Sequence, residues 1–182
     1  MAISGLVITY NEEKNIGKCI DALFEVCDEV IIVDSLSADN TVKIAEEKGA
    51  KVISQKFLGD GPQRTHGLPF CKNDWILNLD ADEFLDKDAK EFILKEKYLE
   101  GNYDAFSFRV KNFLADELID FSGWYPDHKV RFFNKKTAKP SEAKVHQKIE
   151  TTNEKKVAVH ILHYGWESFE QIIAKKNQYS TW

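Results

Sequence analysis

The sequence predicts an α/β fold with a mainly parallel central sheet. Apolar runs of strand length recur along the first half, at 2–8, 29–33, 51–54 and 75–79. Helical patterns separate the first three of these runs, over 15–24 and 39–49. Strands that alternate with helices of this length are typical of βαβ units, in which the strands are parallel.

The first helix is indicated by spacing and the second by its end signals. Ile16, Ile20 and either Leu23 or Phe24 recur at the spacing of one helical face. In the second helix, Asp39 can accept hydrogen bonds from the first turn, and Gly49 can end the helix. The run between the two helices, EVIIV, is rich in β-branched residues and therefore predicts a buried strand.

A third helix is predicted over 86–99, where Asp86 and Asp88 fall in the first turn and are favoured there by the helix dipole. Asp88 and Glu91 have the spacing of a capping box. Beyond this helix the pattern changes to strands without long helices between them, at 105–110, 130–133, 145–149 and 157–162. The last segment, 166–182, is amphipathic. We expect one domain over 1–182.

Composition excludes several classes of protein. With 182 residues, of which 43% are hydrophobic and 12% aromatic, the chain can bury one core and is not disordered. A net charge of -5 argues against a nucleic-acid partner. No apolar run approaches the roughly 20 residues that span a bilayer, and no secretory leader opens the chain. Three cysteines without C-x-x-C spacing suggest a reduced, cytoplasmic location.

Carboxylates follow three of the four predicted parallel strands. Glu12 follows the first, Asp34 the second, and Asp80 and Asp82 the fourth. In an open parallel sheet, ligands bind beyond the carboxyl ends of the strands. Two carboxylates one residue apart can share Mg²⁺ or Mn²⁺, and such an ion keeps positions open for substrate phosphates. The alternative is that Asp82 only begins the turn toward the helix at 86.

Three runs, VITYNEEKNI (7–16), VDSLSADNT (33–41) and WILNLDADE (75–83), in this order and spacing, resemble the inverting glycosyltransferases of family 2. The chain is further similar to the bacterial branch that adds glucose to the lipopolysaccharide inner core. The additional motifs are 59–64 (GDGPQR), 123–127 (GWYPD), 129–133 (KVRFF), Val145-His146, and Lys176-Asn177 with Tyr179. The resemblance spans essentially the whole chain.

The resemblance implies a GT-A fold, in three α/β/α layers with a mixed C-terminal extension. It implies metal-dependent transfer, with inversion, of glucose or a related hexose from a UDP-sugar to a saccharide acceptor. Residues 1–110 would bind the nucleotide-sugar and residues 111–182 the acceptor. That acceptor could be a lipid-linked saccharide of lipopolysaccharide or another surface glycan, reached by peripheral contact with the inner face of the cytoplasmic membrane.

The resemblance also implies roles for single residues. The donor-binding set comprises Thr9, Tyr10 and Glu12 around the nucleotide, Asp34 on uracil or ribose, and Gln63 and Arg64 near the pyrophosphate or sugar. Asp80 and Asp82 would handle the Mg²⁺ or Mn²⁺ ion and the donor, with Asp82 the more direct ligand. An inverting transfer needs one general base. Asp127 is the candidate, and a Pro-Asp turn is the alternative. Trp124 and Tyr125 would either stack on a sugar or pack as ordinary aromatics.

Other readings stay open beside this one. The chain has Gln147 where the branch usually has Glu, so a sugar-nucleotide-binding module without activity is one alternative. A sugar nucleotidyltransferase is another, although it should have a Gly-rich loop where Tyr10 and Glu12 stand. A phosphatase of the haloacid dehalogenase type would have its D-x-D after the first strand. His160 and His163 should lie on opposite faces of a strand and form no simple paired site. His163 could reach the metal or diphosphate, but a structural role is favoured.

Overall fold

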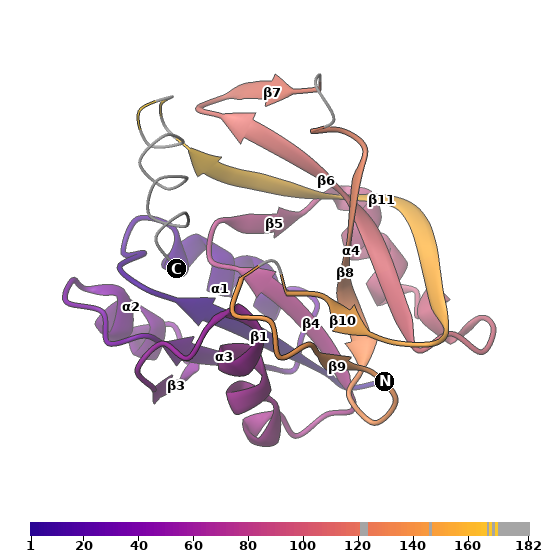
Figure 1. Ribbon diagram of the computed structural model, residues 1–182, viewed down its shortest axis with the longest axis horizontal. Coiled ribbons are helices and arrows are strands. Elements are labelled where there is room, and N and C mark those ends of the chain that lie inside the picture. The colour runs from indigo at the N-terminus through magenta and orange to yellow at the C-terminus, as the bar shows by residue number, and fades with distance from the viewer. Residues whose placement is uncertain (121–123, 146, 167, 169, 171–182) are drawn as a thin grey trace.

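The computed structural model describes residues 1–120, 124–145, 147–166, 168 and 170 (Figure 1). Within these residues, strands from both halves of the chain join one nine-stranded sheet. One side of the sheet is parallel, in the order β3 (Lys51–Ser54), β2 (Glu29–Asp34), β1 (Ile3–Thr9) and β4 (Trp75–Asp80). The predicted α/β class and the four predicted N-terminal strands are therefore confirmed.

The other side of the sheet is mixed. After β4 the order continues with β8 (Asp127–Asn134), β6 (Ala105–Leu114), β11 (Glu154–Trp166) and β5 (Glu83–Leu85), while β7 (Glu117–Ile119) pairs with β6. Only β6 and β11 are parallel neighbours here; the other pairs are antiparallel. The predicted strands 105–110, 130–133 and 157–162 are found, each longer than expected, and they form the expected mixed extension.

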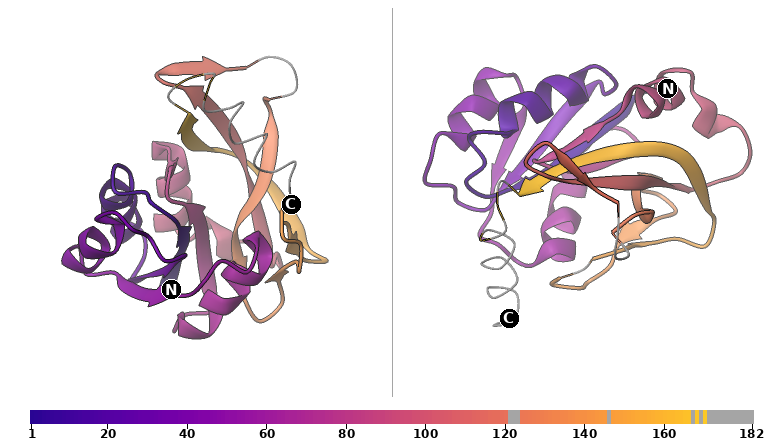
Figure 2. Two further views of the ribbon diagram at one scale, coloured as in Figure 1. Left: turned by 60° about the vertical axis from the view of Figure 1, so that its left-hand side comes forward. Right: turned by 90° about the horizontal axis from the view of Figure 1, so that it is seen from above.

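Helices cover both faces of the sheet (Figure 2). The hydrophobic cluster on one face includes side chains of α1 (Ile16–Phe24), α2 (Thr41–Glu47) and α4 (Lys87–Leu94). The second cluster, on the other face, packs against η1 (Leu68–Phe70), which follows α3 (Asp60–Gly67). In α1, Leu23 is buried and Phe24 is 40% exposed, so Leu23 belongs to the core-facing side. Among the described residues, no helix is both long and apolar enough to cross a membrane.

The predicted helix over 86–99 is divided in two. α4 is followed by η2 (Lys97–Leu99), and Glu96 between them adopts the left-handed conformation at φ 50°. Asp86 is the N-cap residue, because its side chain accepts a hydrogen bond from the Ala89 N–H at 2.8 Å. The predicted capping box of Asp88 and Glu91 is therefore wrong. The reason is that Asp86, two residues earlier, already accepts from an N–H group at the start of the helix.

α3 was not predicted, because its residues, Asp-Gly-Pro-Gln-Arg, have the composition of a turn. The helix begins against segment 141–144, where the N–H groups of Asp60 and Gly61 donate to the carbonyls of Lys144 and Ala143 at 2.8 and 3.0 Å. A Cβ on Gly61 would lie 1.8 Å from the Ser141 carbonyl oxygen, so this contact requires glycine.

One further prediction differs from the structure, and another falls almost wholly outside the described residues. The predicted strand over 145–149 is wrong: in the described part of this range only a short β10 (Ile149–Glu150) begins, paired with β9 (Lys139–Pro140). Its neighbour 141–144 is instead held by α3. The predicted amphipathic segment 166–182 begins at Trp166, which is the last residue of β11. The rest of that segment, apart from residues 168 and 170, lies outside the described residues, as do Gly123 and His146.

Candidate functional site

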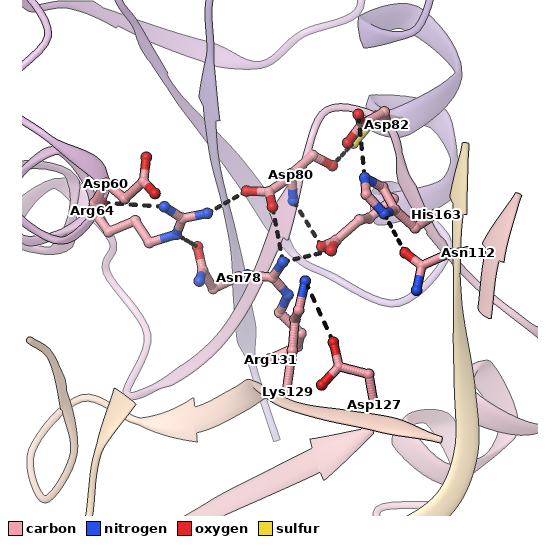
Figure 3. A network of polar contacts seen from close by, with 12 residues as sticks. Asp60, Arg64, Asn78, Asp80, Asp82, Asn112, Asp127, Lys129, Arg131 and His163 are labelled. Carbon is pink, nitrogen blue, oxygen red and sulfur yellow. Dashed lines mark hydrogen bonds and ion pairs between the residues drawn. The ribbon is translucent and has the colours of Figure 1, made fainter. Parts of the chain in front are cut away.

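The carboxyl ends of the parallel strands bring the predicted carboxylates to one edge of the sheet. Thr9, the last residue of β1, pairs with Asp34 of β2, and Ile8 pairs with Asp80 of β4. Asp82 lies two residues beyond Asp80. The predicted carboxylates therefore do lie at one edge of the sheet. Asp80 is surrounded there by a network of polar contacts (Figure 3).

Asp80 is held between two arginines, Arg64 of α3 and Arg131 of β8 (Figure 3). Arg64 contacts one carboxylate oxygen, and Arg131 Nη2 lies 2.8 Å from the other. The same Arg131 nitrogen lies 2.5 Å from Glu83, which in turn accepts a hydrogen bond from the Asp80 N–H at 3.1 Å. The two positive charges of the arginines thus balance the two negative charges of Asp80 and Glu83. Both arginines and Glu83 are less than one-tenth exposed.

Electrostatics fix the protonation states of this network. Burial alone would raise the pKa of Asp80, but the charges of Arg131 and Arg64 outweigh burial and hold that pKa below its usual range. Burial would lower the pKa of Arg131, but Asp80 and Glu83 raise it further above neutrality. Arg64 is also fixed in orientation, because it donates to the Asn78 side chain at 3.2 Å and to the Asp60 carbonyl at 3.1 Å. Asp80 is therefore a fixed anion whose two oxygens are both engaged.

Asp82 faces His163 of β11. The two side chains are 11% and 14% exposed, with Asp82 Oδ2 at 3.5 Å from His163 Nε2. On the other side of the ring, His163 Nδ1 lies 2.8 Å from Asn112 Oδ1. The amide nitrogen of Asn112 donates to the Trp124 carbonyl at 3.3 Å. Four residues from four parts of the chain are thus linked in a row.

The bonds of Asn112 determine the tautomer of His163. A backbone carbonyl only accepts, so the Asn112 amide nitrogen must face Trp124 and its oxygen must face His163. His163 Nδ1 therefore carries a proton, and in the neutral ring the lone pair of Nε2 points to Asp82. Burial lowers the pKa of His163, but the hydrogen bond with Asp82 and its negative charge outweigh burial and raise that pKa. The carboxylate of Asp82 therefore stabilises the charged form of the ring.

This arrangement fits a divalent cation. A neutral imidazole held by a hydrogen bond at its far nitrogen, beside a carboxylate, is the usual form of a histidine-containing metal site. Within the described part of the chain, no three His, Cys, Asp or Glu side chains converge as a metal cluster. The protein would therefore supply Asp82 and His163, and substrate phosphates and water would complete the coordination.

A cleft of about 670 Å³ opens beside Asp80. Arg64, Asp80 and Asp127 line it, so three of the predicted site residues share one space. The side chain of Asp127 is 43% exposed and lies 3.9 Å from the Lys129 ammonium (Figure 3). The remaining wall carries further side chains of the second half, among them Gln147, Lys148, Lys156 and Trp166.

The other predicted donor-binding residues lie at the same edge but outside this cleft. The Asp34 carboxylate accepts hydrogen bonds from the N–H and hydroxyl of Ser37, at 2.9 and 2.5 Å. Gln63 donates to the Ser35 hydroxyl at 3.2 Å and to the Gln55 carbonyl at 3.0 Å, and it accepts from the Leu58 N–H at 3.2 Å. Both side chains therefore shape the loops that follow β2 and β3.

Thr9, Tyr10 and Glu12 differ in what they offer to a ligand. Tyr10 is 60% exposed, whereas Thr9 is buried and its hydroxyl has no hydrogen-bond partner among the described residues. The Glu12 carboxylate accepts from the Asn15 side chain at 3.0 Å. The Thr9 hydroxyl is therefore a buried polar group that carries a free-energy cost, whereas Tyr10 is accessible from solvent.

Three participants have no role in the site predicted from the sequence: Arg131, Glu83 and Asn112. His163 has a predicted reach to the metal or diphosphate, but its pairing with Asp82 was not predicted. Arg131 carried a signal, since it interrupts the apolar run VRFF on a predicted strand. Asn112 carried none, because its contacts join distant segments, whereas Glu83 lies within the run WILNLDADE only three residues from Asp80. Trp124 and Tyr125 make aromatic contacts within the protein, with Trp166 at 5.1 Å and His160 at 6.1 Å between ring centroids.

Comparison with known proteins agrees with this geometry. The model of glycosyl transferase family 2 matches residues 4–153. An uncharacterized glycosyltransferase of Rickettsia bellii is 34% identical over 196 residues, which cover 98% of this chain and 65% of that protein. The chain therefore spans about two thirds of the length of such relatives. The lipopolysaccharide core biosynthesis glycosyltransferase LpsC of Rhizobium meliloti is 36% identical over 98 residues, or 51% of this chain and 36% of LpsC.

Among solved structures, residues 1–349 of Staphylococcus aureus TarS in complex with UDP-GlcNAc superpose with a TM-score of 0.61 at 18% identity. The superposition covers 92% of this chain and 60% of that one, and it supports the fold alone. The family match, which covers most of the chain, and the carboxylates at the strand edge lead to one conclusion. The chain belongs to glycosyl transferase family 2 and has a GT-A fold.

Proposed function

We propose that the protein transfers a hexose from a UDP-sugar to a saccharide acceptor, with inversion and with a divalent cation held by Asp82 and His163. The observation that carries the proposal is the Asp82–His163 pair, at the carboxyl edge of the sheet and oriented by Asn112. Family membership supports the reaction class. The TarS structure is a complex with UDP-GlcNAc, which supports a UDP-sugar as donor for a chain of the same fold.

Asp82, rather than Asp80, is the proposed carboxylate ligand. Both oxygens of Asp80 already contact arginines, and displacing either would break a buried ion pair. Mg²⁺ or Mn²⁺ would suit the site, and the histidine nitrogen favours Mn²⁺ of the two. Such an ion, when bound, offsets the charge that builds up on the departing diphosphate.

The side chains of the protein then have separate tasks. Asp127 accepts the proton of the acceptor hydroxyl. At the same time the hydroxyl oxygen bonds to the anomeric carbon of the sugar, and the bond from that carbon to the diphosphate breaks. Thr9, Tyr10, Glu12 and Asp34 line the nucleotide pocket. Asp80, Arg64 and Arg131 form a rigid part of the cleft wall, and Gln63 holds the neighbouring loops.

The acceptor is proposed from the cleft and one relative. The cleft beside Asp80 is large enough for a sugar residue, and it carries Lys148 and Lys156 from the second half of the chain. The partial similarity to LpsC supports a saccharide of lipopolysaccharide or another surface glycan, acted on at the cytoplasmic face of the membrane.

Gln147 favours a second candidate, a sugar-nucleotide-binding module without activity. It lines the cleft at a position where an acidic side chain could have acted on the acceptor. The two candidates differ in turnover. An enzyme will slowly hydrolyse one of a panel of UDP-hexoses in the presence of Mn²⁺ without acceptor, whereas a binding module will bind the donor and leave it intact.

The first test of the proposal is a thermal shift. UDP with Mn²⁺, each at about 100 times its dissociation constant, should raise the melting temperature by about 5–10 °C. Asp82→Asn and His163→Gln should abolish this gain, because each removes one of two protein ligands. Asp88→Asn, at an exposed acid on α4, is the matched control and should keep it. An undiminished gain in both site variants would refute the metal assignment.

A further inference from the structure

Segment 124–127 (Trp-Tyr-Pro-Asp) leads into β8 and carries Asp127. Asp127 itself pairs with Val110 of β6, and the residues before it are held at two points. The Trp124 carbonyl accepts from Asn112, and the Tyr125 hydroxyl lies 3.1 Å from His160 Nε2. Both supports lead to β11, since Asn112 is bonded to His163 of that strand. The two histidines therefore form no shared site, as expected, but they support the same segment through different atoms.

Tyr125, His160 and Asp86 form a continuous chain of hydrogen bonds. His160 Nδ1 lies 3.0 Å from Asp86 Oδ2, and the two side chains are 16% and 20% exposed. A carboxylate only accepts, so Nδ1 donates to Asp86, and Nε2 of the neutral ring accepts the proton of the Tyr125 hydroxyl. The rings of Tyr125 and His160 are also stacked, with an angle of 23° between them.

Asp86 anchors this chain to the body of the protein. One of its oxygens holds His160, and the other accepts the Ala89 N–H at the start of α4. The backbone of Asp86 is also bonded to that of His160, since the Asp86 N–H donates to the His160 carbonyl at 3.1 Å. The hydroxyl of Tyr125 is therefore tied to a strand and to a helix end that are both part of the folded core.

Asp127 needs such support more than the other site residues do. Asp80 is fixed by two arginines, and His163 is fixed by Asn112. Among the described residues, the ion pair of Asp127 is with Lys129, at 3.9 Å, and its side chain is 43% exposed. A contact of this kind restrains a carboxylate weakly. The position of Asp127 must then come from the backbone of the segment to which it belongs.

We propose that Tyr125, His160 and Asp86 are positioning residues, which hold segment 124–127 so that Asp127 meets the attacking hydroxyl. This inference rests on the proposed function, in which Asp127 is the general base. Tyr125 then acts through its hydroxyl and through Asp127, and not by stacking on a sugar. A misplacement of a reacting group by about 1 Å can cost about 100-fold in rate, so loss of the support of this segment should lower the rate measurably.

The test uses Tyr125→Phe, which removes the hydroxyl and keeps the ring. Activity is measured as UDP release from the UDP-hexose that the wild-type chain hydrolyses with Mn²⁺, where water replaces the acceptor. We expect kcat to fall about tenfold while the affinity for UDP is unchanged. Tyr103→Phe, at a tyrosine that packs on Phe106 in the core, is the matched control and should keep the wild-type rate. His160→Gln, whose amide can still accept from Tyr125, should lose less than His160→Leu.

The decisive step places Tyr125→Phe in the Asp127→Asn background. If the hydroxyl acts through Asp127, the second substitution should lower the residual rate no further. An equal loss in both backgrounds, or a wild-type rate for Tyr125→Phe when Asp127→Asn is inactive, would overturn the inference and leave the proposed function standing. Full activity of Asp127→Asn would instead overturn the choice of base. Nitrogen-15 NMR supplies a readout besides activity: His160 should carry its proton on Nδ1, and a proton on Nε2 alone would contradict the bonding scheme.

Discussion

Asp127→Asn is expected to lower kcat by about 10² to 10⁴ while UDP and Mn²⁺ bind as they do to the wild-type chain. An amide cannot accept the proton that the attacking hydroxyl must lose. The side chain faces the cleft and makes a long contact with Lys129, so its replacement by an isosteric amide should leave the fold intact. The rate is measured as UDP release, and the binding by calorimetry with UDP and Mn²⁺.

Asp116→Asn is the matched control for this prediction. Asp116 is an exposed aspartate between β6 and β7, and its substitution should change neither rate nor binding. Loss of UDP binding in Asp127→Asn would indicate that Asp127 belongs to the donor site. A wild-type rate would indicate that another group takes the proton, and Glu154, which lines the same cleft, would be the next residue to test.

Arg131→Met should destabilise the protein by about 3–5 kcal/mol, which is the usual cost of removing one partner from a buried ion pair. The substitution leaves Glu83, 1% exposed, without its partner, and removes one of the two arginines on Asp80. Methionine fills much of the same volume, so the loss comes from uncompensated charge rather than from a cavity. Unfolding in urea, followed by circular dichroism, measures this difference.

The loss of stability in Arg131→Met should be larger at neutral pH than in acid. The pKa of Asp80 is held below its ordinary value in the folded state, so its ion pairs stabilise the protein above about pH 4 and lose this contribution as the pH falls further. Arg131→Met should therefore differ most from the wild-type chain at neutral pH and less in acid. Lys136→Met, which removes an exposed pair with Asp74, should cost less than about 1 kcal/mol. Equal stabilities of Arg131→Met and Lys136→Met would contradict the role given to the buried network.

The first half of the fold could be predicted because its signals are local. The strands β1 to β4 are short apolar runs, and α1 repeats its buried residues at helical spacing, so neighbouring residues are enough to define both. α3 could not be predicted, since its Gly-Pro composition favours a turn and the contact of Gly61 with Ser141 decides its conformation. The strand expected at 145–149 failed for the related reason that segment 141–144 bonds to α3.

In the candidate site, too, some residues could be located from local sequence and others could not. Asp34, Asp80 and Asp82 could be located because the carboxyl ends of parallel strands meet at one edge. Their partners could not be identified, because Arg131 is 51 residues from Asp80, and His163 is equally far from Asn112. Such pairs depend on the register of β6, β8 and β11, which no local pattern specifies. The proposed roles of the donor-binding residues stay predictions.

In the proposed function, one divalent cation lies between Asp82 and His163 and contacts the diphosphate of the donor. Anomalous diffraction from a crystal grown with UDP and Mn²⁺ tests it most directly. We expect a single manganese peak at about 2.0–2.2 Å from an Asp82 oxygen and His163 Nε2, with Asp80 still between its two arginines. Bound UDP with manganese on Asp80, or with Asp82 and His163 still in contact and no metal between them, would contradict it.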